Sequence, residues 1–203
     1  VSYDHTFTET QGTDTQGMKE FDITYYFGPQ GAYLNEENIK LIAEAGFTSI
    51  PVETSHGAGT AYFKSALEIM RKYGLTCSAL QDPRMSNLVY AAGEITQEQF
   101  DQAAKEIVED YKDYLDVIEG WWLRDEPGAD NFEKLGMAVK AFKKYTPDKE
   151  TMINLFPTYA RNDQLGTNGY QEYLDKFVEI VDPDYLSYDN YPLKADGSCM
   201  YGY

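Results

Sequence analysis

The stretch of the chain best suited to chemistry is WWLRDEP, which places an acid at the end of an aromatic run. Side chains alternate between the two faces of a strand, so Trp122, Arg124 and Glu126 are expected to share a face. If Trp122 and Arg124 point inward, Glu126 points toward the open end of the fold. A carboxyl beside tryptophan at a sheltered strand end would have a raised pKa, as a general acid at neutral pH requires.

Structural roles for Glu126 are also open at this point. Its carboxylate can cap the turn that follows, or it can pair with Arg124. A cation in direct contact lowers the pKa of a carboxyl, so the second arrangement would work against a general acid.

Polar and aromatic residues also come at the ends of the other predicted strands. Strands often end in polar turns, and this explains many of these positions. It explains less well why several of the strand ends carry a carboxylate. In parallel barrels the active site lies at the carboxyl ends of the strands. Besides Glu126 as catalytic residue, we therefore expect substrate contacts from Asp125, Trp122, Tyr25, Glu53, Asp82, Asn154, Asp189 and Tyr191.

The elements that must position these residues alternate regularly along the chain. Apolar runs typical of strands are each followed by residues at helical spacing, and Gly46 and Gly74 mark two helix ends. Residue pairs Thr96/Gln99 and Asp130/Glu133 predict helix caps, whereas residues 82–84 are expected in a loop. Strands are predicted at 21–27, 47–53, 75–81, up to about 125, 151–157 and 184–192, and helices at 35–45, 61–73, 97–115, 130–145 and 170–181.

This alternation predicts an α/β fold with a parallel sheet covered by helices. A doubly wound nucleotide-binding sheet would carry a glycine-rich turn after its first strand, and GPQGAYL lacks that pattern. We therefore predict a (β/α)8 TIM barrel over residues 21–203, preceded by a polar tail or linker at 1–20. A full barrel needs eight strands, so we expect only its first six βα units in this chain.

The amino-acid composition limits the classes of partner that the protein is expected to bind. The formal net charge is −17, which disfavours nucleic acid and anionic membrane surfaces but does not repel a neutral sugar. The chain has 18 Tyr, and tyrosine combines a flat apolar face with a hydroxyl, a pairing that suits sugars. No apolar run is long enough for a membrane span. Neither the cysteines nor the histidines have ligand spacing, so we predict no metal site and no cofactor.

The motif Asp125–Pro127 resembles the Asn-Glu-Pro that ends the fourth strand in a large group of retaining glycoside hydrolases with (β/α)8 barrels. The segment LSYDNYPL at 186–193 is similar to the sixth-strand end of uncharacterised bacterial barrel hydrolases. The resemblance covers residues 21–193. It implies a glycoside hydrolase acting on an oligosaccharide or polysaccharide, with Glu126 as the acid/base.

The chain departs from that family in two ways. Asp125 stands where the family has the asparagine that contacts the sugar 2-hydroxyl; an aspartate accepts that hydrogen bond but cannot donate one. Its charge beside Glu126 would raise one pKa of the pair. The family nucleophile is a glutamate at the end of strand seven, so we expect the second carboxylate outside this chain. The alternatives within it are Glu53, Asp82 and Asp189.

Two other functions remain open. One is a carbohydrate-binding barrel that lacks catalysis. The other is a barrel lyase or aldolase, although no predicted strand carries the lysine that a Schiff-base aldolase needs. Enolase-type chemistry would require acidic metal ligands on successive strand ends, and Asp82, Asp125 and Asp189 match that pattern weakly. We expect a secreted or periplasmic protein, and the sequence does not define its oligomeric state.

Overall fold

The computed structural model describes residues 22–26, 28–52 and 60–193, so the predicted tail at 1–20 lies outside the described residues. Helices follow the successive strand segments along the chain, and the last three of these segments form the named strands β1, β2 and β3. In order they are η1 (Gly31–Tyr33), α1 (Glu36–Glu44), α2 (Thr60–Lys72), α3 (Pro83–Tyr90), α4 (Gln97–Tyr111), η2 (Lys112–Tyr114), β1 (Gly120–Asp125), η3 (Ala129–Asn131), α5 (Phe132–Tyr145), β2 (Glu150–Leu155), α6 (Asn162–Leu165), α7 (Tyr170–Val181) and β3 (Ser187–Tyr188).

The sheet is parallel and its strands follow chain order, β1-β2-β3. The first three predicted strands lie in sequence beside it, but isolated bridges hold them in place of continuous ladders. These parallel bridges are Ser49–Thr76, Val52–Leu80, Cys77–Ile118 and Leu80–Trp121, and the Thr48 amide donates to the Ile23 carbonyl. Neighbouring segments are therefore also neighbours in sequence, which is the strand order of a barrel.

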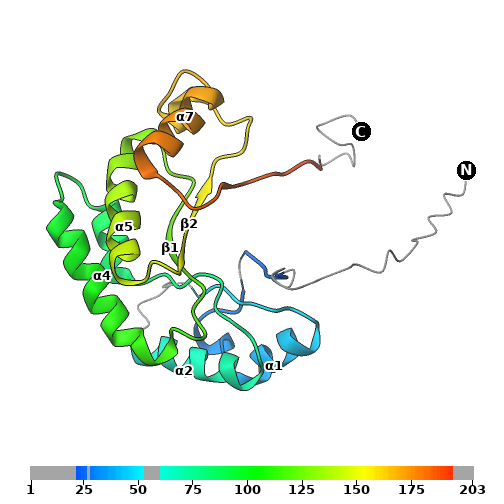
Figure 1. Ribbon diagram of the computed structural model, residues 1–203. Coiled ribbons are helices and arrows are strands. Elements are labelled where there is room, and N and C mark those ends of the chain that lie inside the picture. The colour runs from blue at the N-terminus through cyan, green and yellow to red at the C-terminus, as the bar shows by residue number, and fades with distance from the viewer. Residues whose placement is uncertain (1–21, 27, 53–59, 194–203) are drawn as a thin grey trace, which may run out of the picture.

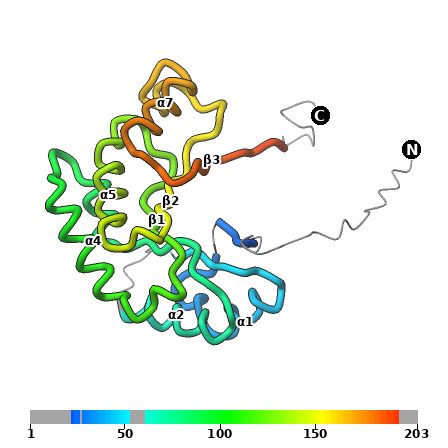
Figure 2. Tube along the Cα trace, viewed as in Figure 1, coloured from blue at the N-terminus to red at the C-terminus, as the bar shows by residue number. Residues whose placement is uncertain are grey.

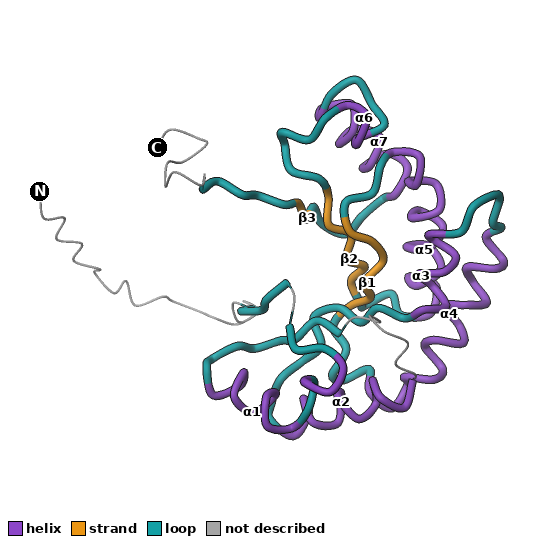
Figure 3. The backbone as a smooth tube through the Cα atoms, turned by 180° about the vertical axis from the view of Figure 1, so that it is seen from behind, coloured by secondary structure: helices purple, strands orange, loops and turns teal. Residues whose placement is uncertain are grey.

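The helices form an outer arc, and the strand segments line its inner side (Figure 1). Seen from behind, β1, β2 and β3 lie side by side, with α3, α4 and α5 covering their outer face (Figure 3). The tube view shows the same arrangement, with α1 and α2 beside the segments nearest the start of the described chain (Figure 2). This is the layering of a (β/α) barrel, with strands inside and helices outside.

The core fills the space between the strands and the helices. Trp121 of β1 points outward and stacks on Phe142 of α5, with ring centroids 4.7 Å apart and planes 7° from parallel. Its indole N–H donates to the Thr146 hydroxyl at 3.0 Å, so the buried polar atom is satisfied. Phe132 of α5 also packs on α7, with its ring tilted against Tyr173 and edge-on to Phe177. These contacts fix α5 and α7 behind the strands whose ends carry the candidate site.

A β-bulge in β1 overturns the predicted alternation of side chains. Trp122 pairs with Met152 and Arg124 with Ile153, so Leu123 is the extra residue. Trp122 therefore faces the inside of the arc, whereas Arg124 faces the helices, where its guanidinium lies 3.9 Å from the ring centroid of Tyr90. The prediction that Trp122 and Arg124 share a face is wrong.

Three local predictions also need correction. Residues 83–90 form the helix α3, in place of the expected loop. The capping box of Thr96 and Gln99 is confirmed. The cap predicted from Asp130 and Glu133 is wrong, because the turn η3 precedes α5 and its N-cap residue is Asn131. The sixth strand is also shorter than the predicted 184–192, since only residues 187–188 join the ladder.

Candidate active site

A group of polar side chains lies at the carboxyl ends of the strand segments, where barrel enzymes carry their active sites. Asp125 ends β1, Glu126 follows it, Asn154 lies near the end of β2, and Asp189 follows β3. Tyr26 joins them from the first segment. We call these five residues the strand-end cluster. The sequence predicted four of them; the fifth place was given to Tyr25, the neighbour of Tyr26.

Asn154 connects the cluster. Its side-chain amide donates to Asp125 Oδ1 at 3.1 Å and to Asp189 Oδ1 at 2.7 Å. Its amide oxygen accepts a hydrogen bond from Ser187 Oγ at 2.9 Å, and its side chain is almost fully buried, with 3% of the residue exposed. The hydroxyl of Tyr26 donates to the same oxygen of Asp125. Two carboxylates from different strands are thus held by one buried amide.

The backbone at Glu126 is unusual. Its φ is +41°, in the left-handed region that non-glycine residues rarely adopt. Its N–H donates to the Asn154 carbonyl at 2.8 Å, and the next carbonyl, of Pro127, accepts from the buried Tyr173 hydroxyl at 2.7 Å. These two bonds hold a strained conformation, which is a feature that concentrates at functional sites. The neighbours of the Glu126 carboxyl are Asp189 and Asp125 of the cluster.

The surroundings of Glu126 raise the pKa of its carboxyl from 4.5 to about 7. The largest cause is partial burial, which disfavours the charged form; a hydrogen bond with Asp189 and the negative charges of Asp189 and Asp125 add to it. Arg124 would oppose this rise, but the bulge turns it to the other face of β1. The side chain thus has the protonation that a general acid requires near neutral pH.

Two tyrosine hydroxyls complete the polar lining. Tyr26 donates to Asp125, and Tyr191 donates to Asp189 Oδ2 at 3.0 Å. Burial is the main reason that the pKa of Tyr26 is raised, and the hydrogen bond to Asp125 raises it further. Tyr191 is 58% exposed, so its ring is open to a ligand. Both phenols keep their protons and act as donors to the aspartates.

Trp122 and Tyr25 lie behind the cluster, inside the arc. The Trp122 ring packs on Tyr26, with centroids 5.2 Å apart, and Trp122 and Tyr25 line an interior cavity of about 280 Å³. The buried Tyr25 hydroxyl has no hydrogen-bond partner among the residues that the structure describes, and burial raises its pKa. The inside of a closed barrel is filled by side chains. Trp122 therefore contacts the cluster through Tyr26, and the substrate contacts expected of Trp122 and Tyr25 stay predictions.

Asp82 has different partners from those expected. Its carboxylate caps α3 by accepting from the Arg84 amide at 2.9 Å, and it also accepts from the Arg84 guanidinium at 2.9 Å through both oxygens. Arg84 in turn binds Asp110 at 2.6 Å. These bonds give Asp82 a structural role. Glu53, also predicted as a site residue, lies outside the described residues.

Sequence reasoning missed three residues of this region. Ser187 orients the Asn154 amide, Tyr173 holds the Pro127 carbonyl, and Tyr26 binds Asp125. Only Tyr26 left a usable signal, because it also stands at a predicted strand end. Ser187 and Tyr173 act through single hydrogen bonds that depend on how β3 and α7 pack.

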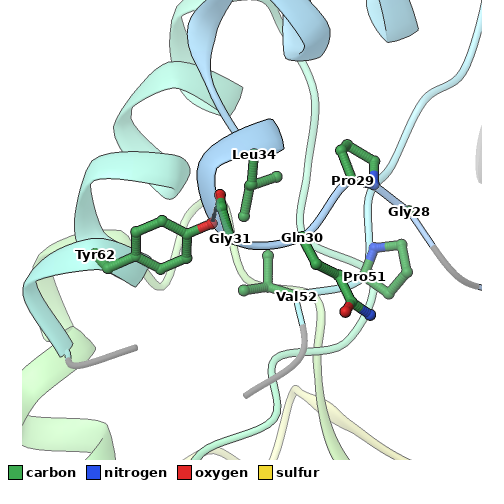
Figure 4. Close-up of a pocket in the computed structure, with 8 residues that line it drawn as sticks. All are labelled: Gly28, Pro29, Gln30, Gly31, Leu34, Pro51, Val52 and Tyr62. Carbon is green, nitrogen blue, oxygen red and sulfur yellow. Dashed lines mark hydrogen bonds between the residues drawn. The ribbon is translucent and has the colours of Figure 1, made fainter. Parts of the chain in front are cut away.

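A second hollow lies beside the 28–31 turn and is lined by Gly28, Pro29, Gln30, Gly31, Leu34, Pro51, Val52 and Tyr62 (Figure 4). The Tyr62 hydroxyl donates to the Gly31 carbonyl at 2.5 Å and closes one side. The hollow has a volume of about 10 Å³, which is room for about one water molecule. It is too small for a sugar.

Residues 22–26, 28–52 and 60–193 hold no group of three or more His, Cys, Asp or Glu side chains arranged to bind a metal ion. Within the same ranges, no helix has the length and apolar character required to cross a membrane.

No protein-family profile and no curated protein matches the chain. Solved structures match it by fold. They include β-1,4-mannanase from the sea hare Aplysia kurodai (TM-score 0.52, 15% identity, 82% of this chain and 65% of that one). β-Glucuronidase 2 from Bacteroides uniformis matches with TM-score 0.55 and 14% identity over 88% of this chain and 21% of that one. Family 1 β-glucosidase from Thermotoga maritima matches with TM-score 0.50 and 13% identity over 81% and 59%.

These comparisons confirm the predicted fold class. The chain has an α/β fold that matches TIM-barrel glycosidases, and the described residues form part of such a barrel. The chain spans about three fifths of the length of the Thermotoga enzyme and about a fifth of the glucuronidase. At 13 to 15% identity the likeness establishes the architecture. Function has to be argued from the site.

Proposed function

We propose that this barrel is a glycoside hydrolase in which Glu126 is the general acid. The observation that carries the proposal is the environment of Glu126 at the strand ends. Its carboxyl is partly buried, bonded to Asp189 and adjacent to Asp125, with a pKa of about 7. A carboxyl with this pKa is about half protonated at pH 7, and its protonated form can donate to a leaving glycosidic oxygen. The glycosidases among the structural neighbours support this class of reaction on this fold.

The substrate we propose is an oligosaccharide or polysaccharide. Asp125, Asp189 and the exposed Tyr191 offer acceptors and a donor to sugar hydroxyls, and the Tyr191 ring offers an apolar face to sugar C–H groups. A neutral sugar is compatible with the net charge of −17. The three carboxyls would repel an anionic ligand, which favours an uncharged sugar at this position.

The second catalytic carboxylate requires a separate assignment. Retaining enzymes hold their two carboxyls about 5 to 5.5 Å apart, and inverting enzymes about 6.5 to 9.5 Å. Asp189 already accepts hydrogen bonds from the Asn154 amide and the Tyr191 hydroxyl. Asp82 is occupied by the cap of α3 and by Arg84. We therefore propose a carboxylate at the end of a seventh strand, in accordance with the family resemblance, as the group that attacks the anomeric carbon.

Hydrolysis of a panel of aryl glycosides by the full-length protein tests the proposal. Wild type is compared with Glu126→Gln, which is isosteric but cannot donate the proton, and with Glu94→Gln in an exposed loop as the matched control. We expect kcat/KM to fall by about 10² to 10⁴ in Glu126→Gln, the usual contribution of general acid catalysis. The control variant keeps wild-type activity.

Other outcomes distinguish the alternatives. If wild type cleaves a substrate and Glu126→Gln cleaves it equally well, Glu126 is structural and the assignment of the acid is wrong. If folded wild type cleaves nothing but binds sugars in calorimetry, the barrel is a carbohydrate-binding protein. The aspartate at position 125, where the family has asparagine, is the feature that would favour that second function.

A further inference from the structure

Three carboxyls meet at the strand ends, and the structure gives two of them a shared donor. Asn154 has two amide hydrogens, and they bind Asp125 Oδ1 at 3.1 Å and Asp189 Oδ1 at 2.7 Å. Glu126 receives nothing from this amide; only its backbone N–H contacts Asn154, through the carbonyl. Asp125 and Asp189 therefore accept hydrogen bonds from the Asn154 amide, whereas the Glu126 carboxyl does not.

The orientation of the Asn154 amide is set by its other contact. Ser187 Oγ donates to the amide oxygen at 2.9 Å, which directs the NH2 group toward the two aspartates. The reverse orientation would place the amide oxygen against two carboxylates, which is repulsive. With 3% of the residue exposed, water does not replace these bonds. Buried donors of this kind stabilise the ionised form of the carboxyls that they bind.

We propose that Asn154 is a positioning residue: its amide donates to Asp125 and Asp189 but not to Glu126, and so leaves Glu126 as the carboxyl of the cluster that carries the proton. The inference builds on the proposed role of Glu126 as the acid. The hydroxyls of Tyr26 and Tyr191 act in the same sense, since they donate to Asp125 and Asp189 respectively. Each aspartate thus accepts hydrogen bonds from two donors, whereas the hydrogen-bond partner of the Glu126 carboxyl is Asp189.

The groups that face Glu126 come from several elements. Asp125 at the end of β1 and Asp189 after β3 are the acidic neighbours, and Tyr173 of α7 and Tyr191 are the phenols. Without the Asn154 donors, an aspartate competes for the proton of the cluster. A protonated Asp189 would then donate to the Glu126 carboxylate and stabilise its ionised form. Removal of the amide is therefore expected to lower the pKa of Glu126.

The test reads the proton directly and does not depend on turnover. In protein labelled with ¹³C at the glutamate side-chain carboxyls, NMR follows the Glu126 resonance, assigned through its absence in Glu126→Gln, from pH 4 to 9. We expect a midpoint near 7 in wild type. In Asn154→Leu, which keeps the volume and removes the donors, we expect the midpoint to fall by about one pH unit. Thr151→Val is the matched control and keeps the wild-type midpoint, because it removes a buried hydroxyl of the same strand that has no hydrogen-bond partner among the described residues.

Two further variants make the result decisive. Asn154→Gln restores an amide donor and is expected to recover part of the shift. Ser187→Ala keeps the Asn154 amide but removes the hydrogen bond that orients it, so it should lower the Glu126 midpoint by a smaller amount. If Asn154→Leu does not fold, the Ser187→Ala midpoint tests the proposal in its place. An unchanged Glu126 midpoint in folded Asn154→Leu, or in Ser187→Ala when the first variant fails, overturns the proposal. Inactivity toward glycosides with the predicted midpoints would reject the proposed function and leave this inference standing.

Discussion

Replacing Glu126 by glutamine should make the protein more stable at alkaline pH, even though it removes the proposed catalytic group. The folded-state pKa of about 7 lies above the ordinary value of 4.5. The folded state therefore binds more protons than the unfolded chain between these values, and its stability falls as pH rises through that window. Glutamine cannot ionise, so the variant escapes this loss.

The size of the effect follows from the same two values. A difference of 2.5 in pKa, from 4.5 to about 7, corresponds to at most about 3.4 kcal/mol of destabilisation once Glu126 is ionised. Glu126 is only partly buried, and solvent screening reduces the effect to about 1 to 2 kcal/mol. Below pH 4.5 the carboxyl is protonated in both states, and the variant has no such advantage.

Urea unfolding of wild type, Glu126→Gln and the control Glu94→Gln at pH 5, 6, 7 and 8 measures this effect. The stability of Glu126→Gln relative to wild type should rise by about 1 to 2 kcal/mol between pH 5 and 8. The Glu94→Gln difference should stay flat. A Glu126→Gln difference that does not change with pH would refute the argument, because it would mean that the folded and unfolded states bind the same number of protons at this residue.

Two substitutions test the supports of the site. Asp82→Ala removes the cap of α3 and leaves Arg84 without its buried partner. We therefore expect the free energy of unfolding, measured in urea, to fall by about 2 to 3 kcal/mol. A change below about 0.5 kcal/mol would contradict the structural role given to Asp82. Tyr173→Phe leaves the buried Pro127 carbonyl without its donor and should destabilise the protein by about 1 to 2 kcal/mol; equal stability of variant and wild type would contradict this.

Much of the site could be predicted because of one geometric rule. Parallel strands that run side by side end at the same edge, so Asp125, Asn154 and Asp189 were expected together although they lie far apart in the sequence. The apolar runs and the glycine stops predicted the order of the strand segments and most helices, whereas only β1, β2 and β3 form ladders in the described sheet. The helix α3 also left a signal, since Asp82 before Pro83 is a cap followed by proline at the first helical position.

The remainder depends on three-dimensional packing. The bulge at Leu123 arises from the pairing of β1 with β2 and reverses the side to which Arg124 points, which strand alternation alone does not reveal. The left-handed backbone of Glu126 is held by bonds from Asn154 and Tyr173, and no residue type at position 126 predicts it. The hydrogen bonds from the Asn154 amide to Asp125 and Asp189 likewise depend on how the strands pack.

The most direct test of Glu126 as the general acid compares leaving groups. A poor leaving group such as an alkoxide needs a proton from the enzyme, whereas a dinitrophenolate does not. We predict that Glu126→Gln loses about 10² to 10⁴ in kcat/KM on methyl or natural glycosides and far less on the dinitrophenyl glycoside of the same sugar. Equal losses on both substrates, measured with the full-length protein, would contradict the role assigned to Glu126.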